Sequence, residues 1–153
     1  PHGRGTVGMV QVFPNSRNVI PGRVKFSIDL RNSTDALVDA MAAEVKAFAD
    51  QVAKEHGVQV HIEMVSSYPA QLFQPECVEA VGRAAAKLGY SHMPAVSGAG
   101  HDAVYMAKLA PSGMIFIPCK DGISHNEIED AKPEHIEAGC NVLLHAMLER
   151  AGM

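Results

Sequence analysis

The segment Ile115–Glu129 carries the residue best suited to chemistry in this chain, His125. The apolar run from Met114 to Ile117 ends at Pro118, and a polar loop with acidic residues follows. In α/β proteins a buried strand that runs into a polar loop places functional side chains at its carboxyl end. The imidazole could bind a metal or act as a general base, although loop histidines are often simply solvated. One histidine makes no site alone, so its partners must be sought elsewhere.

A glycine-containing turn, Ser-Gly-Ala-Gly-His-Asp over residues 97–102, lies between an expected strand and an expected helix. Backbone N–H groups at the start of a helix can hold an anion such as a carboxylate, which makes Gly98 and Gly100 candidate binding residues. The alternative is a tight turn in which Asp102 caps the helix and His101 packs against a neighbour. The pattern lacks the full GxGxxG and the Walker lysine, so both interpretations stay open.

Two polar residues near the amino terminus could contact a ligand. Arg31 ends an amphipathic strand that carries Asp29 on the same face. An arginine can bind a carboxylate through two parallel hydrogen bonds, but a surface ion pair with Asp29 would contribute less than ~1 kcal/mol. Asn18 precedes Pro21-Gly22, a dipeptide suited to a type II turn, which the Asn18 side chain would stabilise.

Composition restricts the class of protein. The 153 residues suffice for one ordinary domain or two small ones. With 47% hydrophobic and 20% charged residues, the composition is that of a soluble globular protein. A net charge of -4 excludes a basic footprint for nucleic acid, and no apolar run approaches the roughly 20 residues that span a membrane. The three cysteines are widely spaced and odd in number, which argues against a disulfide framework and indicates a reducing, cytoplasmic compartment.

The first 70 residues should contain two strands, a helix and a third strand. Thr6–Phe13 alternates weakly, and Val24–Leu30 alternates clearly between apolar and polar residues. Ser33 or Thr34 should cap a helix that ends before Gly57, and residues 58–64 alternate again. This order matches the last four of the six elements of a ferredoxin-like β-α-β-β-α-β unit, whose first strand and helix would precede Pro1. Starting on proline rather than methionine also suggests a piece of a longer chain.

Residues 71–153 should alternate helices and short strands. Helices are expected from Pro75 to Gly89, from residue 102 to Ala110, and from Pro133 onward, with strands at 93–96 and 114–117. Such alternation indicates an α/β layer. Two strands are too few for an independent sheet, so we expect them to complete a larger one. We place a domain boundary near residue 70.

Three phrases taken together resemble a known family. They are Pro-Asn-Ser-Arg-Asn-Val-Ile-Pro-Gly over 14–22 with Phe-Ser-Ile-Asp-Leu-Arg over 26–31, Ser-Gly-Ala-Gly-His-Asp-Ala over 97–103, and Met-Ile-Phe-Ile-Pro-Cys-Lys-Asp-Gly-Ile-Ser-His-Asn over 114–126. In this order they resemble the amidase/hydantoinase/carbamoylase branch of the dinuclear metallopeptidase superfamily. That branch includes N-carbamoyl-L-amino-acid hydrolases, allantoate amidohydrolases and β-alanine synthases.

The resemblance implies an architecture and roles for residues. Residues 1–70 match part of a ferredoxin-like lid that also forms a homodimer, and 71–153 match the C-terminal portion of an α/β catalytic domain. His125 matches the last metal-ligating histidine. Asn18 and Arg31 match residues that bind the substrate, with the arginine on its carboxylate, and the backbone amides at Gly98 and Gly100 match a loop that holds the same carboxylate.

The resemblance also implies what this chain lacks. The remaining metal ligands and the glutamate general base belong to the N-terminal half, so no catalytic residue is expected here. The intact enzyme would use a divalent metal (zinc, manganese, cobalt or nickel) to activate water for attack on a carbamoyl or ureido group. This chain alone need bind none, and we expect it to be inactive.

Two alternatives stay open. One is a non-enzymatic dimerisation or small-molecule-binding module built on residues 1–70. The other is an aminoacylase or dipeptidase of the same superfamily. The residues do not choose among carbamoyl amino acids, allantoate and β-ureidopropionate as substrate.

Overall fold

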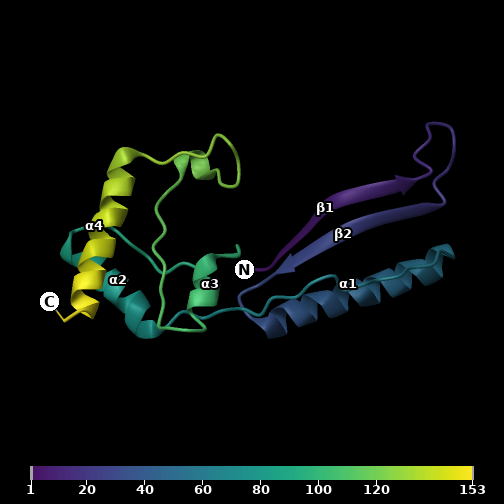
Figure 1. The fold of residues 1–153 in the computed structure, drawn as a ribbon. Helices are drawn as coiled ribbons and strands as arrows, with labels where there is room; N and C mark the ends of the chain where they lie inside the picture. The colour runs from purple at the N-terminus through teal and green to yellow at the C-terminus, as the bar shows by residue number, and fades with distance from the viewer. Residues whose placement is uncertain (1, 153) are drawn as a thin grey trace. The chain divides into compact units, whose positions relative to one another are not determined.

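The computed structural model describes residues 2–152, which form a mixed α/β chain with one two-stranded sheet and four α-helices (Figure 1). The chain divides into two compact units, Pro1–Ala70 and Gln71–Met153. Whether these units correspond to a lid and a catalytic domain stays a prediction. No helix within residues 2–152 combines the length and the apolar character needed to cross a membrane.

The first unit begins with an antiparallel hairpin of β1 (Arg4–Phe13) and β2 (Arg23–Arg31) (Figure 1). Both strands were expected from the sequence, and they pair antiparallel. The register shifts between Val7 and Met9, which is a β-bulge. The Pro-Gly turn expected to be type II is not formed, because Gly22 does not adopt the positive φ that this turn requires.

The bulge explains why the alternation in β1 is weak. An extra residue reverses the face to which the following side chains point. Val10 therefore pairs with Phe26 on the same apolar face on which Val7 pairs with Ile28. The opposite face of the hairpin carries the polar cross-strand pairs Gln11–Lys25, Thr6–Asp29 and Arg4–Arg31.

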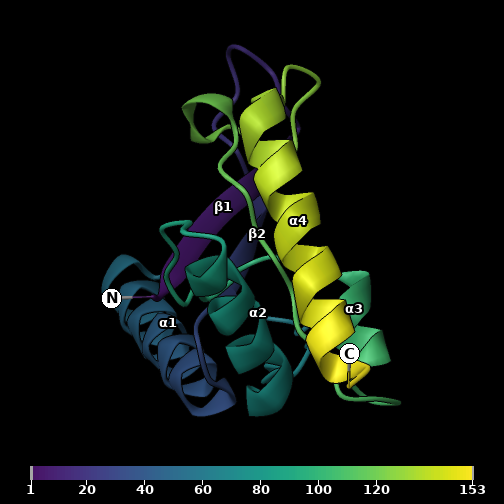
Figure 2. The ribbon, with the colours of Figure 1, turned by 90° about the vertical axis from the view of Figure 1, so that its left-hand side faces the viewer.

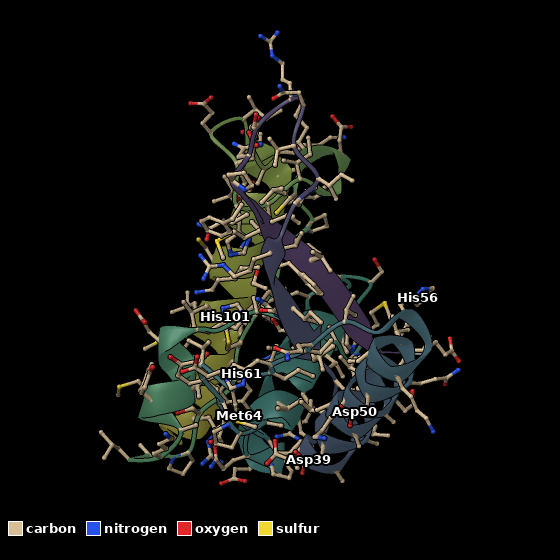
Figure 3. All side chains as sticks on the ribbon, turned by 90° about the vertical axis from the view of Figure 1, so that its right-hand side faces the viewer. Asp39, Asp50, His56, His61, Met64 and His101 are labelled. Atoms are coloured by element: carbon tan, nitrogen blue, oxygen red, sulfur yellow. The ribbon has the colours of Figure 1, made fainter. Side chains whose placement is uncertain are left out.

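Helix α1 (Asp35–His56) follows the hairpin and contacts β2. Of the two expected caps, Thr34 is the one used, since its hydroxyl oxygen accepts from the Leu37 N–H, 3.4 Å away. Gly57 ends the helix in the left-handed conformation, with φ of 64°. Figure 3 shows His56 at this end of α1.

The strand expected at residues 58–64 is not formed. A strand requires a neighbouring ladder to pair its backbone groups, and no such partner lies beside this segment within residues 2–152. Figure 3 shows His61 and Met64 on this stretch after α1. The ferredoxin-like arrangement of the first unit is therefore not confirmed. The segment is anchored further on, where the Ala70 N–H donates to Asp35 Oδ1 at 2.7 Å.

The second unit is built on α2 (Pro75–Lys87) and α4 (Pro133–Arg150), which lie side by side (Figures 1 and 2). Both helices begin with proline at the first-turn position, as expected. Their contact is made by small residues that allow close approach, and Ile115 packs against it. The buried cluster consists of Ala84, Ala85, Val142 and Ala146.

Helix α3 (Asp102–Met106) is shorter than expected. The chain continues to Ala110 as turns, with the N–H groups of Leu109 and Ala110 both donating to the Met106 carbonyl at 2.9 Å. The strands expected at 93–96 and 114–117 also lack a ladder partner within residues 2–152 and are not formed as strands. A short 3₁₀ turn, η1 (Lys120–Gly122), opens the loop that contains His125.

Candidate functional site

The loop after residue 117 returns on itself before α4. Its ends are joined by a 2.7 Å hydrogen bond from the Lys120 N–H to the Asp130 carbonyl. Asp121 and His125 adopt positive φ values of 54° and 58°. Non-glycine residues rarely enter this region, and they do so most often where the surroundings impose it. The role of this loop in function stays a prediction.

Glu129 organises this loop, and sequence reasoning missed it. Its Oε2 accepts from the His125 N–H at 2.8 Å, and its Oε1 lies 3.9 Å from Cys119 Sγ. The imidazole Nδ1 of His125 lies 3.1 Å from Ser124 Oγ, so Nε2 is the nitrogen that can bind a metal. The signal in the sequence was a carboxylate four residues after the histidine, within reach of its backbone in a tight loop.

His125 does not fit a metal centre by itself. A catalytic zinc site usually needs three protein ligands, and residues 2–152 contain no group of three histidine, cysteine or acidic side chains arranged to hold an ion. Any metal held at His125 would therefore need further ligands beyond those that residues 2–152 arrange around it.

The glycine turn is closed by side chains at its two ends. Ser97 Oγ lies 2.6 Å from His101 Nε2 and also accepts from the Ala99 N–H at 3.2 Å. With one proton and two lone pairs, the hydroxyl can either donate to Nε2 or accept from it. The His101 ring also lies 5.5 Å from that of Phe116, between centroids. This is the packed turn histidine that the sequence left as an alternative.

The two glycines differ in their surroundings. Gly98 is half-buried and Gly100 is exposed, with open space where a Cβ would stand. Asp102 does not cap α3, because it is the first helical residue and His101 precedes it as the cap without a side-chain bond. The Ala99 amide between the glycines donates to Ser97 rather than outward. A role for the turn in holding a carboxylate stays a prediction.

Arg31 holds a carboxylate within its own strand. Its Nε donates to Asp29 Oδ1 at 2.7 Å and its Nη2 to Oδ2 at 3.1 Å. The hydrogen bond from Arg31 is the main cause that lowers the pKa of Asp29, and the same bond raises the pKa of Arg31. The two side chains are 50% and 53% exposed, so water screens their attraction strongly. Arg31 is thus half-exposed and contacts the carboxylate of Asp29 at two points.

Asn18 lies in the loop at the far end of the hairpin. Its Oδ1 accepts from Ser16 Oγ at 2.8 Å, the local stabilising role expected as the alternative. The whole of β2 separates Asn18 from Arg31, which is roughly 25–30 Å at ~3.3 Å per residue. One copy of the chain therefore does not bring these two side chains together.

The sequence of the chain assigns it to a known protein family. It matches peptidase family M20/M25/M40 over residues 2–149 and belongs to that family. Among individual proteins, it is 50% identical over 147 residues to the N-carbamoyl-L-amino-acid amidohydrolase of Rhizobium meliloti, covering 96% of this chain and 35% of that protein. It is 34% identical over 140 residues to the ureidoglycolate hydrolase of Arabidopsis thaliana, covering 91% of this chain and 29% of that protein.

Comparison with a solved structure agrees with the comparison of sequences. The hydantoinase/carbamoylase family amidase from Burkholderia multivorans superposes with a TM-score of 0.94 at 55% identity, covering 99% of this chain and 37% of that one. The present chain spans about a third of the length of the relatives that it matches.

Proposed function

We propose that this chain is part of a metal-dependent amidohydrolase that cleaves the carbamoyl or ureido C–N bond of a small carboxylate-bearing substrate. The observation that carries the proposal is the 50% identity over 147 residues to an N-carbamoyl-L-amino-acid amidohydrolase. The similarity to ureidoglycolate hydrolases supports a ureido group as the common chemical feature. Allantoate-like substrates fall in the same chemical class.

The residues of this chain would position the substrate. Arg31 would bind its carboxylate, a role supported by the two-point grip that the guanidinium already has on Asp29. The amides around Gly98 and Gly100 would hold the same carboxylate. Asn18, exposed in the hairpin loop, would contact the substrate at another point.

His125 would supply one ligand through Nε2 to a divalent metal in the intact enzyme. Zinc, manganese, cobalt and nickel all accept imidazole. Because one imidazole does not hold a metal centre, the other ligands and the general base would come from outside this chain. The chain alone would therefore be inactive.

A kinetic comparison of two arginines tests the substrate role. In the full-length protein, Arg31→Ala should raise the KM for N-carbamoyl-L-alanine at least about tenfold, since hydrogen bonds to charged groups are worth ~1.5–3 kcal/mol. Arg83→Ala is the matched control, because Arg83 is also exposed and also holds a carboxylate, that of Glu149, through Nε and Nη2. An unchanged KM in Arg31→Ala would remove this residue from the site.

A panel of substrates would distinguish the proposed activity from those of aminoacylases and dipeptidases. Ureidoglycolate and N-carbamoyl-L-amino acids should be hydrolysed, whereas N-acetyl amino acids and dipeptides should not. Turnover of only the latter two would move the protein to the aminoacylase or dipeptidase class.

We also propose that the protein acts as a homodimer through residues 1–70. The separation of Asn18 from Arg31 supports this, because two side chains roughly 25–30 Å apart along β2 cannot both touch one small substrate. They could do so only if they came from two copies. Large apolar side chains exposed on the first unit, among them Val10, Phe26 and Phe48, are also typical of a surface that packs against further protein.

Complementation between impaired variants tests the shared site. Full-length Asn18→Ala and Arg31→Ala proteins should each be impaired, and a random mixture of their subunits should recover about a quarter of the wild-type activity, because half the dimers are mixed and each has one intact site. If both residues serve the site of their own copy, the mixture should recover nothing.

A further inference from the structure

We infer that Phe13 and Arg23 are positioning residues, whose stacked side chains hold the loop of residues 14–22 in the place from which Asn18 reaches the substrate. The inference rests on the proposed role of Asn18 in binding the substrate. Neither Phe13 nor Arg23 would itself touch the substrate or the scissile bond.

The two side chains meet where the loop between β1 and β2 leaves the hairpin (Figure 1). Phe13 ends β1, Arg23 begins β2, and the two residues lie directly opposite each other in the antiparallel ladder. The guanidinium carbon of Arg23 lies 4.2 Å from the centroid of the Phe13 ring, inside the ~6 Å within which an aromatic face attracts a cation. The Gly22 N–H also donates to the Phe13 carbonyl at 3.0 Å. The base of the loop is therefore closed by backbone and by side chains.

Phe13 lies on the polar face of the hairpin, where a phenyl ring is out of place without such a partner. Residues two apart on a strand share a face, so Phe13 and Arg23 lie on the face that carries the Gln11–Lys25 pair. A ring among such neighbours gains little from hydrophobic packing, and 38% of Phe13 is exposed. The guanidinium of Arg23 covers one face of this ring.

The loop depends on its base because it has little packing of its own. Every residue from 14 to 22 is exposed, and segments with few buried contacts open at a small cost in free energy. Within the loop, Ser16 Oγ donates to Asn18 Oδ1 at 2.8 Å. That bond orients the Asn18 side chain relative to its neighbours in sequence, but it does not fix the loop relative to the strands. The stack at the base supplies the second restraint.

A direct role for Arg23 is the competing explanation, since a guanidinium can also bind a substrate carboxylate. The two roles differ when Arg23 and Asn18 are changed together. A residue that acts through Asn18 has no effect left to lose once the Asn18 side chain is removed. A residue that binds the substrate directly keeps its own effect, and the two changes then add.

The test uses three substitutions in the full-length protein. Arg23→Gln removes the cation and keeps a long polar side chain, whereas Arg23→Lys keeps a cation. Lys108→Gln is the matched control, because Lys108 Nζ lies over the Tyr105 ring, 5.5 Å from its centroid, in a second exposed pair of the same kind. The readouts are the KM and kcat for N-carbamoyl-L-alanine, and the rate at which trypsin cleaves after Arg17 in the loop.

Arg23→Gln should raise the KM about two- to fivefold, the range that corresponds to ~0.5–1 kcal/mol for an exposed cation–π pair. Its kcat should stay within about twofold. Arg23→Lys should recover most of the loss, and Lys108→Gln should change neither constant. In a protein that already carries Asn18→Ala, Arg23→Gln should raise the KM no further. Trypsin should cleave after Arg17 about two- to fivefold faster in Arg23→Gln, because the population of the open loop rises by the same factor.

Several results would overturn the inference. An unchanged KM in Arg23→Gln, beside a raised KM in Asn18→Ala, would show that the loop keeps its place without the stack. An equal rise in KM from Arg23→Gln with and without the Asn18 side chain would show that Arg23 acts on the substrate directly. Unchanged cleavage after Arg17 in Arg23→Gln would refute the restraint itself, whatever the KM.

Failure of the proposed function would look different. An unchanged KM in Asn18→Ala would overturn the proposed role of Asn18, and the positioning role would fall with it. Faster cleavage after Arg17 in Arg23→Gln would then leave the stack as a purely structural restraint on the loop.

Discussion

Gly139 in α4 offers a sharp test of how the second unit holds the His125 loop. A Cβ added at Gly139 would lie 2.8 Å from Ile117 Cγ2, closer than real Cβ contacts approach. Ile117 ends the extended segment that leads into the loop. Its Cγ2 is attached to a branched Cβ, so it cannot move aside without a change of χ1 or of backbone. We expect Gly139→Ala to push this segment away from α4.

Two opposing terms determine the free energy of unfolding of this variant. Replacing a helical glycine by alanine stabilises a helix by up to ~1 kcal/mol, whereas overpacking costs about 1–3 kcal/mol. Gly82→Ala in α2 is the matched control, because the nearest atom to its added Cβ, His92 Nε2, lies at an ordinary 3.7 Å. The propensity term cancels between the two variants, so their difference isolates the overpacking cost of about 1–3 kcal/mol.

Thermal unfolding of the full-length protein measures this difference. For a folded unit of 150–250 residues, each kcal/mol shifts Tm by about 2–4 °C, so Gly139→Ala should melt several degrees below Gly82→Ala. Ile117→Ala removes the clashing methyl group, and a double-mutant cycle should show that it relieves the defect of Gly139→Ala. If Gly139→Ala melts at or above Gly82→Ala, the close approach of α4 to Ile117 does not exist as described.

Three further predictions concern the candidate sites. His125→Ala should lower the metal content of the full-length protein measured by mass spectrometry, whereas His135→Ala should not; full occupancy in His125→Ala would refute the ligand assignment. Glu129→Gln removes the charged acceptor of the His125 backbone N–H. It should weaken metal binding about tenfold in a chelator titration, as the loss of a residue that holds a metal ligand in place typically does. Unchanged affinity would limit Glu129 to a role in loop structure. The pKa of Asp29 is lowered from 3.8 chiefly by its hydrogen bond to Arg31, so the pair should stabilise the protein above pH 3.8, by no more than ~1 kcal/mol because it is exposed. This contribution should disappear as the pH falls through the lowered pKa, and a difference between wild type and Asp29→Asn that persists at lower pH would contradict it.

Elements that depend on local signals could be predicted from the sequence. The cap at Thr34, the left-handed Gly57 and the proline starts of α2 and α4 each depend on residues within one or two helical turns. The clear alternation in β2 also identified its polar face. The β-bulge between Val7 and Met9 explains why the partner strand was harder to define.

The secondary structure of the extended segments could not be predicted from the sequence in the same way. Residues 58–64 and 114–117 have the apolar pattern of strands, but a strand exists only where a second backbone pairs with it. The pattern records which side chains are suited to burial in a sheet, and not whether a neighbouring strand lies beside them. Within residues 2–152 that neighbour is absent.

The sequence by itself determined the residue types of the candidate sites, including the imidazole of His125 and the Asp29–Arg31 pair on one strand face. Only the tertiary structure decided how these residues are used. It brought the Glu129 carboxylate to the backbone N–H of His125 and the Ser97 hydroxyl to the imidazole of His101. It also separated Asn18 from Arg31 by the length of β2. These outcomes depend on loop closure and chain direction, which bring together or separate residues irrespective of the local pattern around each one.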